Sequence, residues 1–427
     1  MATFLVFAGL VLLLLVGVPI AVAMGLTAII AILALADVSL LGVVAQRMYA
    51  STTSFTLLAI PFFILAGNLM NTGGMTQRIF DFAHALVGHV KGGLGQVNIV
   101  GSMIFAGMSG SALADAMGLG AIEIKAMTDA GYEKRFSAAV SAASSTIGPV
   151  IPPSIPLVIF GSMAGVSVGA LFLGGIIPGL LMGGAMMVTV AIIARRRNYP
   201  SEPRSTLRNA LKRLGNGLPA LATPAIIMGG ILTGWFTPTE ASVVACAYAL
   251  FLGMVVYREL KLKDLPRILL ETADQTAQVM FIVAAAGLFG WVLTYLRVPD
   301  ALIAGLTAFS DNKWVVLTII NLILLALGCF MEGIAIMLLT IPIFLPIILK
   351  VGIDPVHFGV VMTLNLMIGL LTPPVGMVLY AMSSVAKVSI VELTRELVPF
   401  IISIFVALVL ITYVPGFVTW LPRLFFN

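Results

Sequence analysis

The sequence predicts an all-α integral membrane protein built from two inverted repeats, and three observations lead to this fold class. Of its 427 residues, 60% are hydrophobic and only 10% are charged, whereas a soluble globular domain has roughly 25% charged residues. Apolar runs recur along the whole chain and leave no stretch for a separate soluble domain. The two halves also share glycines and prolines at a fixed offset, which indicates an internal repeat.

Ten apolar segments are expected to cross the membrane, because a helix needs about 20 apolar residues to span a ~30 Å hydrocarbon core. These segments are approximately 2–17, 18–36, 54–73, 136–164, 168–194, 216–235, 237–256, 275–297, 357–385 and 390–415. The first segment lacks the basic start of a signal peptide and continues directly into more apolar sequence. We therefore expect it to be retained as a span.

Two further apolar stretches, about 93–130 and 314–350, are broken near their middles by small and polar residues. We expect each to form a re-entrant helical hairpin that enters and leaves on one side. Irregular backbone at membrane depth is tolerated only when it is buried in protein or lines a cavity. Segments 76–90 and 299–312 have mixed polarity and predict amphipathic helices that link a fixed scaffold to a moving core.

The charges predict an orientation in a bacterial inner membrane. The linker 195–215 is basic, with seven Lys or Arg against one Glu in 195–213, and cytoplasmic loops are enriched in Lys and Arg. If the ten segments cross and the hairpins do not, 18 of the 23 Lys and Arg lie inside and 5 outside. Both termini are then periplasmic. The net charge of +5 reflects this orientation, and no nucleic-acid partner is expected.

The repeat relates residues 1–194 to residues 216–427 at an ungapped offset of 221. The matched positions are Gly107 and Gly328, Gly131 and Gly352, Ile147-Gly148 and Ile368-Gly369, Pro152-Pro153 and Pro373-Pro374, and Pro178 and Pro399. Because Gly and Pro restrict or free the backbone, shared positions predict shared bends. Each half holds five crossings and one hairpin, so the halves have opposite orientations. Secondary transporters commonly have this plan, with the binding site at the repeat interface.

The chemistry is expected where each hairpin tip meets an unwound stretch of the following crossing. In the first half the tip is 107–115 (GMSGSALAD), and the crossing carries SSTIGPVIPPS at 144–154. Its three prolines forbid a continuous helix. In the second half the tip is 328–333 and the unwound stretch is 365–376. Exposed carbonyls and hydroxyls suit a sodium ion, and half-helix N-termini suit a carboxylate.

Each tip and loop therefore predicts a sodium site, with the substrate between the two sites. The candidate sodium ligands are Ser109, Ser111, Ser145, Thr146, Gly148, Gly328, Glu332, Gly369 and Thr372. The candidate substrate contacts are Ser144, Pro152, Ser154, Asn365 and Pro373. Sodium is the expected coupling ion, and no organic cofactor is expected.

Structural alternatives stay open for these residues. Ser and Thr can simply satisfy backbone groups or let helices pack closely. Glu332 can cap the second helix of its hairpin, and Asp115 can be structural. Asn365, like Asn98 and Asn321, is more often a helix–helix contact than a ligand.

Two other function classes are weaker. A membrane-embedded hydrolase would use Ser109 or Ser111 as its nucleophile, but no His or Lys base lies in an obvious matching span, and no HExxH motif occurs. The chain is therefore not expected to be an enzyme. A channel would also suit two opposed hairpins, but a pore needs no large mobile domain.

Five segments of the chain closely resemble the large membrane subunit of TRAP transporters, the DctM type within the ion transporter superfamily. They are IPFFILAGNLMNTGG (60–74), GMSGSALADAMGLG (107–120), SSTIGPVIPPSIPLVIFG (144–161), TPTEA (237–241) and GLLTPPVGMVLY (369–380). Runs of this length are far more specific than a short glycine pattern, and the resemblance covers essentially the whole chain.

The resemblance implies a secondary transporter that is driven by sodium and works by an elevator mechanism. It implies two partners, a periplasmic substrate-binding protein of the DctP type and a small membrane subunit of the DctQ type, which we expect to be a separate chain. It implies a small anionic solute such as a C4-dicarboxylate, a sialic acid or another organic acid. The first tip and loop map to the family's first sodium region, and the second tip and loop to its second.

Overall fold

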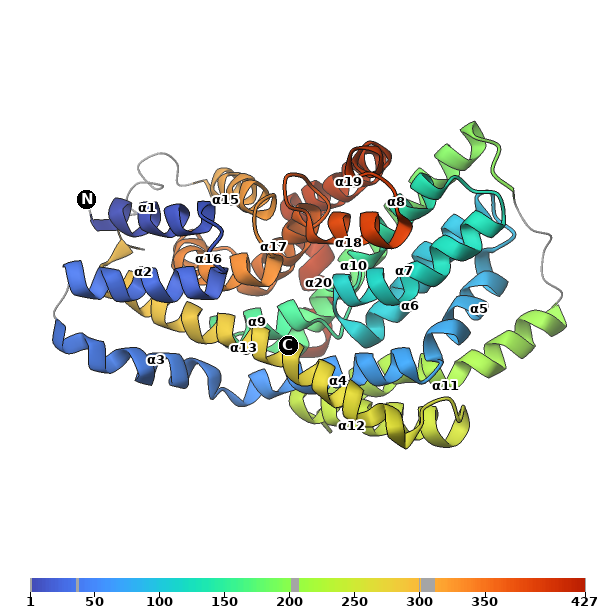
Figure 1. Ribbon diagram of the computed structural model, residues 1–427, viewed down its shortest axis with the longest axis horizontal. Helices are drawn as coiled ribbons and strands as arrows, with labels where there is room; N and C mark the ends of the chain where they lie inside the picture. Colours follow the sequence, from blue (N-terminus) through green and yellow to red (C-terminus); the bar gives the residue numbers. More distant parts are fainter. Residues whose placement is uncertain (1, 36–37, 201–206, 299, 301–311, 427) are drawn as a thin grey trace.

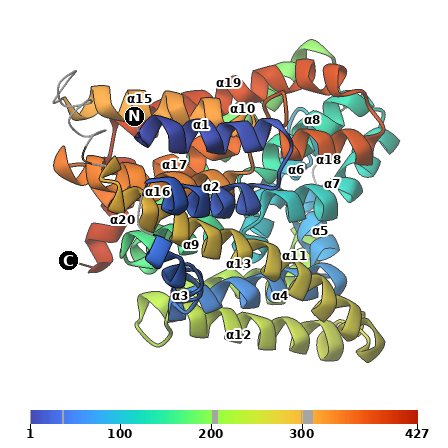
Figure 2. The same ribbon diagram turned by 60° about the vertical axis from the view of Figure 1, so that its left-hand side comes forward.

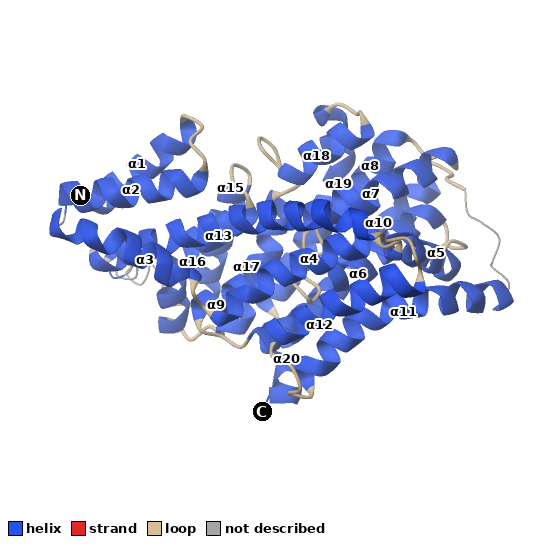
Figure 3. Cartoon of the chain, turned by 60° about the horizontal axis from the view of Figure 1, so that its bottom comes forward, coloured by secondary structure: helices blue, strands red, loops and turns tan. Residues whose placement is uncertain are grey.

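The computed structural model describes the chain except for residues 1, 36–37, 201–206, 299, 301–311 and 427. Within the described residues every regular element is a helix, as Figure 3 shows. Seven of the described helical segments are long and apolar enough to cross a membrane. The predicted all-α membrane class, with its two helical hairpins, is therefore confirmed.

The N-terminal part contains four helices that lie at one end of the molecule and along its lower face (Figure 1). They are α1 (Ala2–Leu15), α2 (Ile20–Leu35), α3 (Gly42–Thr52) and α4 (Ala59–Thr72). The predicted crossings 2–17 and 18–36 are present as α1 and α2. At 14 and 16 residues they are roughly 21 and 24 Å long, shorter than a ~30 Å core. Helix α3 was not predicted, because its polar sequence contains no apolar run.

The first hairpin and its broken crossing follow. Their helices are α5 (Met75–Val87), α6 (Gly93–Ser109), α7 (Ala112–Asp129), α8 (Lys134–Ser145), α9 (Ile155–Ala164) and α10 (Val168–Arg196). Helix α5 is the amphipathic helix predicted at 76–90, whereas its predicted counterpart at 299–312 lies almost wholly outside the described residues. The hairpin is α6 and α7, and the crossing predicted at 136–164 is divided into α8 and α9.

The second half repeats this order of elements. Its helices are α11 (Leu207–Leu232), α12 (Pro238–Phe251), α13 (Leu265–Tyr295), α15 (Lys313–Gly328), α16 (Gly333–Lys350), α17 (Pro355–Gly369), α18 (Met377–Ala386), α19 (Ile390–Tyr413) and α20 (Gly416–Phe426). The hairpin is α15 and α16, and the broken crossing is α17 and α18. Helices α11 and α13 begin earlier than predicted, because their polar first turns lie outside the apolar core of each crossing. Helix α20 was not predicted.

The packing brings elements from both halves to the centre of the molecule (Figure 2). Helix α7 of the first hairpin packs against α18 of the second half, and α16 of the second hairpin packs against α9 of the first half. Likewise α8 packs against α19, and α17 packs against α10. Around this centre α4, α12 and α13 form a separate layer in which α4 contacts both others. The two hairpins and two broken crossings are therefore mutually packed.

Candidate transport site

The first hairpin tip is a two-residue turn between α6 and α7. Gly110 has φ 59°, the left-handed conformation that favours glycine, and Ser111 accepts a hydrogen bond from Ala114 N at 3.4 Å as the N-cap of α7. A Cβ added to Gly110 would lie 2.6 Å from the carbonyl oxygen of Pro153. The tip therefore rests directly on the backbone of the broken crossing. The side chain of Ser109 lies outside the described part of the structure.

The broken crossing of the first half leaves α8 at Ser145 and resumes at Ile155. Ser154 caps α9 by accepting from Leu157 N at 3.2 Å, and its hydroxyl donates to the carbonyl of Pro149. The loop contains a cis Pro152–Pro153 bond and is buried along almost its whole length. The sequence correctly predicted that this crossing unwinds.

Hydroxyls at the end of α8 donate to the helix itself. Ser145 Oγ donates to Ala142 O at 2.9 Å, and Thr146 Oγ1 donates to Ala143 O at 2.5 Å. These bonds are the backbone-satisfying contacts that the structural alternative expects. A hydroxyl that donates once still has two oxygen lone pairs. The geometry therefore leaves both hydroxyl oxygens able to coordinate a cation.

The second tip and loop touch through their glycines. A Cβ added to Gly369 would lie 2.6 Å from Gly328 Cα, so the end of α17 contacts the end of α15 backbone to backbone. Val375 N donates to Cys329 O at 3.0 Å and joins the loop to the tip. Thr372 Oγ1 donates to Ile368 O at 2.7 Å, in the same manner as the hydroxyls of α8.

Glu332 is the N-cap of α16, because its Oε2 accepts from Ala335 N at 2.9 Å. The capping alternative is therefore present in the structure, and a carboxylate has further acceptor positions for another partner. Asn365 donates to Asn321 O at 3.0 Å and to Asn321 Oδ1 at 2.9 Å, so its amide joins α17 to α15. The side chain thus faces the second hairpin, as expected for a helix–helix contact. Its own Oδ1 is buried without a partner among the described residues.

The remaining candidates divide between a buried and an exposed environment. Ser144 is fully buried and donates to Asn98 Oδ1 at 2.6 Å, and Pro152, in the loop that follows α8, is buried as well. Pro373 is exposed, and the neighbouring loop borders a cavity of about 310 Å³. The cavity is lined by Pro374, Val375, Met377 and Tyr380.

A series of buried side-chain hydrogen bonds joins α6 to α8, and it was not predicted from the sequence. Ser102 donates to Ser144 at 3.1 Å, and Asn98 Nδ2 donates to Ser141 Oγ at 2.6 Å. The signal was available in the serines of α8, which recur at helical spacing at positions 141, 144 and 145. Asp115 lies nearby on α7, is 1% exposed and faces the hydroxyl of Ser102.

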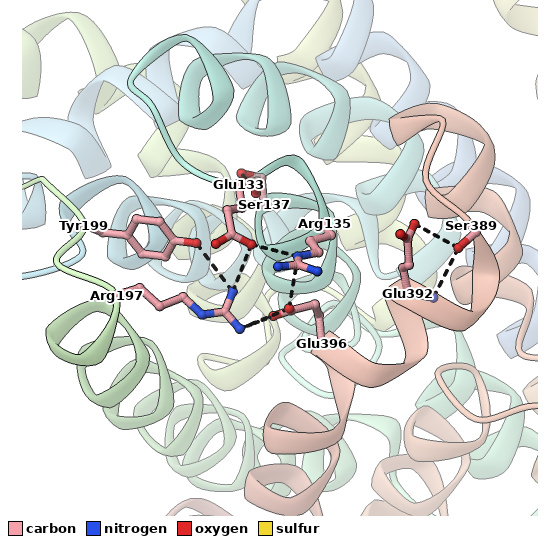
Figure 4. A network of polar contacts seen from close by, with 8 residues as sticks. All are labelled: Glu133, Arg135, Ser137, Arg197, Tyr199, Ser389, Glu392 and Glu396. Atoms are coloured by element: carbon pink, nitrogen blue, oxygen red, sulfur yellow. Dashed lines mark hydrogen bonds and ion pairs between the residues drawn. The ribbon is translucent and has the colours of Figure 1, made fainter.

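A network of ion pairs, shown in Figure 4, lies at the start of α8 and the end of α10. Arg197 Nη2 lies 2.9 Å from Glu396 Oε2 on α19, and Arg135 Nε lies 3.4 Å from Glu396 Oε1. Arg135 also donates to Glu133 at 2.7 Å, and this hydrogen bond raises the pKa of Arg135 above its usual value. The network ties the first half of the chain to α19 of the second half.

Known proteins provide an independent assignment. A family model described as "Tripartite ATP-independent periplasmic transporter, DctM component" matches residues 7–417. The chain is 50% identical over 381 residues to the sialic acid TRAP transporter large permease SiaM of Vibrio cholerae, covering 89% of each chain. It is 41% identical over 379 residues to the C4-dicarboxylate TRAP transporter large permease DctM of Pseudomonas aeruginosa, again covering 89% of each.

Among solved structures, the crystal structure of the YdaH transporter of Alcanivorax borkumensis has a similar fold, with a TM-score of 0.64. The two sequences are 15% identical, and the match covers 97% of this chain and 98% of the other. At this identity the similarity extends to the fold alone.

Proposed function

The chain belongs to the family of DctM components of tripartite ATP-independent periplasmic transporters, and from this premise we propose that it imports a carboxylate-bearing solute with sodium. It is a multi-pass membrane permease and not an enzyme. The solute, the coupling ion, the mechanism and the partners are the parts of this proposal that go beyond family membership.

The contact between each hairpin tip and its broken crossing is the observation that carries sodium coupling. Gly110 lies against the carbonyl of Pro153, and Gly328 lies against Gly369, so each tip meets a stretch where helical carbonyls are released. Hydroxyl oxygens lie at both breaks. The first proposed site uses Ser109, Ser111, Ser145, Thr146 and Gly148, and the second uses Gly328, Glu332, Gly369 and Thr372.

The solute is proposed to lie between the two sites, beside the N-termini of the half-helices α9 and α18. The positive ends of helix dipoles favour a carboxylate. Ser144, Pro152, Ser154, Asn365 and Pro373 are its proposed neighbours. Relatives named for sialic acid and for C4-dicarboxylates share the carboxylate, and we propose an organic acid of this class as the substrate.

An elevator motion of inverted repeats is supported by the reciprocal packing of the two halves. The pair α7 and α18 corresponds to the pair α16 and α9 under exchange of the halves, as do α8 with α19 and α17 with α10. If residues 1–194 and 216–427 are related by a two-fold axis, each contact between the halves must have a counterpart with the two halves swapped. We propose that the hairpins and broken crossings move as one body against the layer of α4, α12 and α13.

The basic linker 195–215 is proposed to be cytoplasmic and both termini periplasmic, in a bacterial inner membrane. The proposed partners are a small membrane subunit of the DctQ type and a periplasmic binding protein of the DctP type.

Reconstitution of the chain with both partner proteins in liposomes tests the proposal. Uptake of a panel of organic acids is measured with and without an inward sodium gradient. We expect accumulation of one acid above its external concentration only when sodium and the binding protein are present. Flux that only follows the solute gradient, and that ignores sodium, would instead favour a channel.

A further inference from the structure

Glu123 is a buried acid that the proposed sodium and substrate sites do not use. It lies on α7, about two helical turns beyond Asp115, and is 1% exposed. Its Oε1 has no hydrogen-bond partner among the described residues. A Cβ added to Gly101 on α6 would lie 3.4 Å from this oxygen, so the glycine leaves room for the carboxyl group.

No positive charge among the described residues faces Glu123. Helices α6, α8 and α18 pack against α7. Helix α6 carries no charged residue, and the only titratable group of α18 is the exposed Tyr380. On α8 the charges are the exposed Lys134 and Arg135 of its first turn.

The charges on α7 itself do not compensate Glu123 either. Lys125 and Asp129 are exposed, so neither is buried beside the carboxyl group. Asp115 is the other buried acid of α7, and when it is ionised its charge has the same sign as that of Glu123. An ionised Glu123 would therefore be an unpaired charge in the interior of a membrane protein, which is strongly unfavourable.

The hydrogen bonds around Glu123 offer it too few donors to hold a negative charge. Ser141 is the polar side chain that faces it, and Ser141 Oγ already accepts from Asn98 at 2.6 Å. Its single hydrogen is left for the carboxyl group. An ionised carboxylate offers about four acceptor positions, so one donor leaves most of them unsatisfied.

Sodium is a poor fit for the same reason. The other nearby oxygens are bonded to one another: Ser144 Oγ donates to Asn98 Oδ1 at 2.6 Å and accepts from Ser102 at 3.1 Å. Asn98 Oδ1 and Ser144 Oγ each already accept one hydrogen bond and keep one lone pair, so a cation that requires several oxygens finds few free positions here. A proton requires only the carboxyl group itself.

We propose that Glu123 binds a proton inside the first hairpin and is neutral while α7 is packed against α6 and α8. Loss of this proton places an unpaired negative charge inside the hairpin, on the same helix as Asp115, and loosens the hairpin. Solute transport should therefore fall at alkaline pH. The proton site itself does not depend on the proposed substrate or coupling ion.

Infrared spectroscopy of the purified full-length chain tests the proton directly. The difference spectrum between the wild type and Glu123→Gln should show the carbonyl stretch of a protonated carboxyl group at neutral pH. The matched control Glu271→Gln removes a half-exposed glutamate that pairs with Arg267 at 3.0 Å, and its difference spectrum should show only an ionised carboxylate.

Ser141→Ala is the second variant, for use where Glu123→Gln does not fold. It should shift the frequency of the protonated-carboxyl band by removing the hydroxyl that faces it. Absence of the band at every pH at which the protein stays folded overturns the proposal. A band that disappears when sodium is added at constant pH assigns the site to sodium and also overturns it.

The transport consequence is measured in the reconstituted complex and rests on the proposed function. Wild-type uptake should fall by up to about tenfold per pH unit once the proton is lost, while Glu123→Gln should show a weaker fall over the same pH range and still require sodium. An identical pH profile in the two proteins overturns the coupling to transport. Because the infrared result needs no uptake, a failure of the proposed function is distinguishable from a failure of the proton site.

Discussion

The two broken crossings have the same backbone plan but different surroundings. In the first half, the loop between α8 and α9 is buried, and Ser154 is 0% exposed. In the second half, the position 221 residues later is Val375, which is 40% exposed and borders the cavity of about 310 Å³. Shared Gly and Pro positions thus give shared bends, whereas the packing around each bend decides which loop is exposed.

The polar content of the two regions differs in the same direction. Buried Asn98, Ser102, Asp115 and Glu123 lie around the first crossing, whereas the second hairpin meets its crossing through the Asn365–Asn321 hydrogen bonds and the close approach of Gly328 and Gly369. Both tips approach their crossing backbone to backbone, at Gly110 and at Gly369, and the first region adds the buried acids Asp115 and Glu123. This difference predicts that substitutions will act through different physical causes in the two halves.

Cysteine labelling should give the largest effect. In a background without Cys246 and Cys329, Val375→Cys should react fully with a membrane-impermeant thiol reagent, whereas Ser154→Cys should remain unlabelled. The two positions correspond at the offset of 221, so they form a matched pair. Equal labelling of both in the resting protein would mean that the two loops are equally accessible. It would contradict the difference in burial between the two broken crossings.

Gly369→Ala tests the close backbone approach. The added Cβ would lie 2.6 Å from Gly328 Cα and 2.8 Å from its carbonyl oxygen, so backbone must shift. Overpacking of this kind typically costs 1–3 kcal/mol, and we expect sodium-dependent uptake to fall about tenfold or more.

The matched control for Gly369→Ala is Gly229→Ala on α11, where an added Cβ meets nothing within 4 Å. Uptake by the control should be unchanged. A normal rate in Gly369→Ala would show that this contact is not needed for transport.

Two variants of Glu332 distinguish a role in helix capping from a role in sodium binding. Glu332→Gln keeps an oxygen that can accept from Ala335 N, whereas Glu332→Ala loses the cap at a cost of about 1 kcal/mol. If the carboxylate binds sodium, both variants should need several times more sodium for half-maximal uptake. Wild-type sodium dependence in Glu332→Gln, with a defect only in Glu332→Ala, would assign Glu332 to capping alone.

The threonine and serine hydroxyls should have smaller effects. Thr372→Val and Ser145→Ala each remove one hydroxyl that donates to its own helix. If the oxygen also coordinates sodium, the sodium concentration for half-maximal uptake should rise about threefold to tenfold. Thr340→Val is the control, because Thr340 also donates to its own helix, to Ile336 O at 2.7 Å, away from both breaks. An unchanged sodium requirement in both test variants would remove these hydroxyls from the sites.

Much of the fold could be predicted from the sequence because membrane spans depend on apolar length, and helix breaks depend on proline. Pro149, Pro152 and Pro153 were sufficient to predict the end of α8. Helix α3 and the early start of α13 could not be predicted in this way, because their polar turns are stabilised by packing against other elements. The Asn98–Ser141 contact depends on a register between α6 and α8 that one sequence does not specify.

The ion pairs at the end of α10 should contribute least. Arg197 and Glu396 are 33% and 11% exposed, and ion pairs of this kind typically stabilise a protein by about 0.2–1 kcal/mol. Arg197→Gln should therefore lower the thermal stability of the purified chain slightly at low salt, and less at high salt, since salt screens the interaction. The control Arg267→Gln breaks an ion pair within α13 alone and should have a still smaller effect. Arg197 joins α10 to α19 and so connects the two halves. An equal loss of thermal stability in both variants would show that this connection adds nothing beyond a local surface contact.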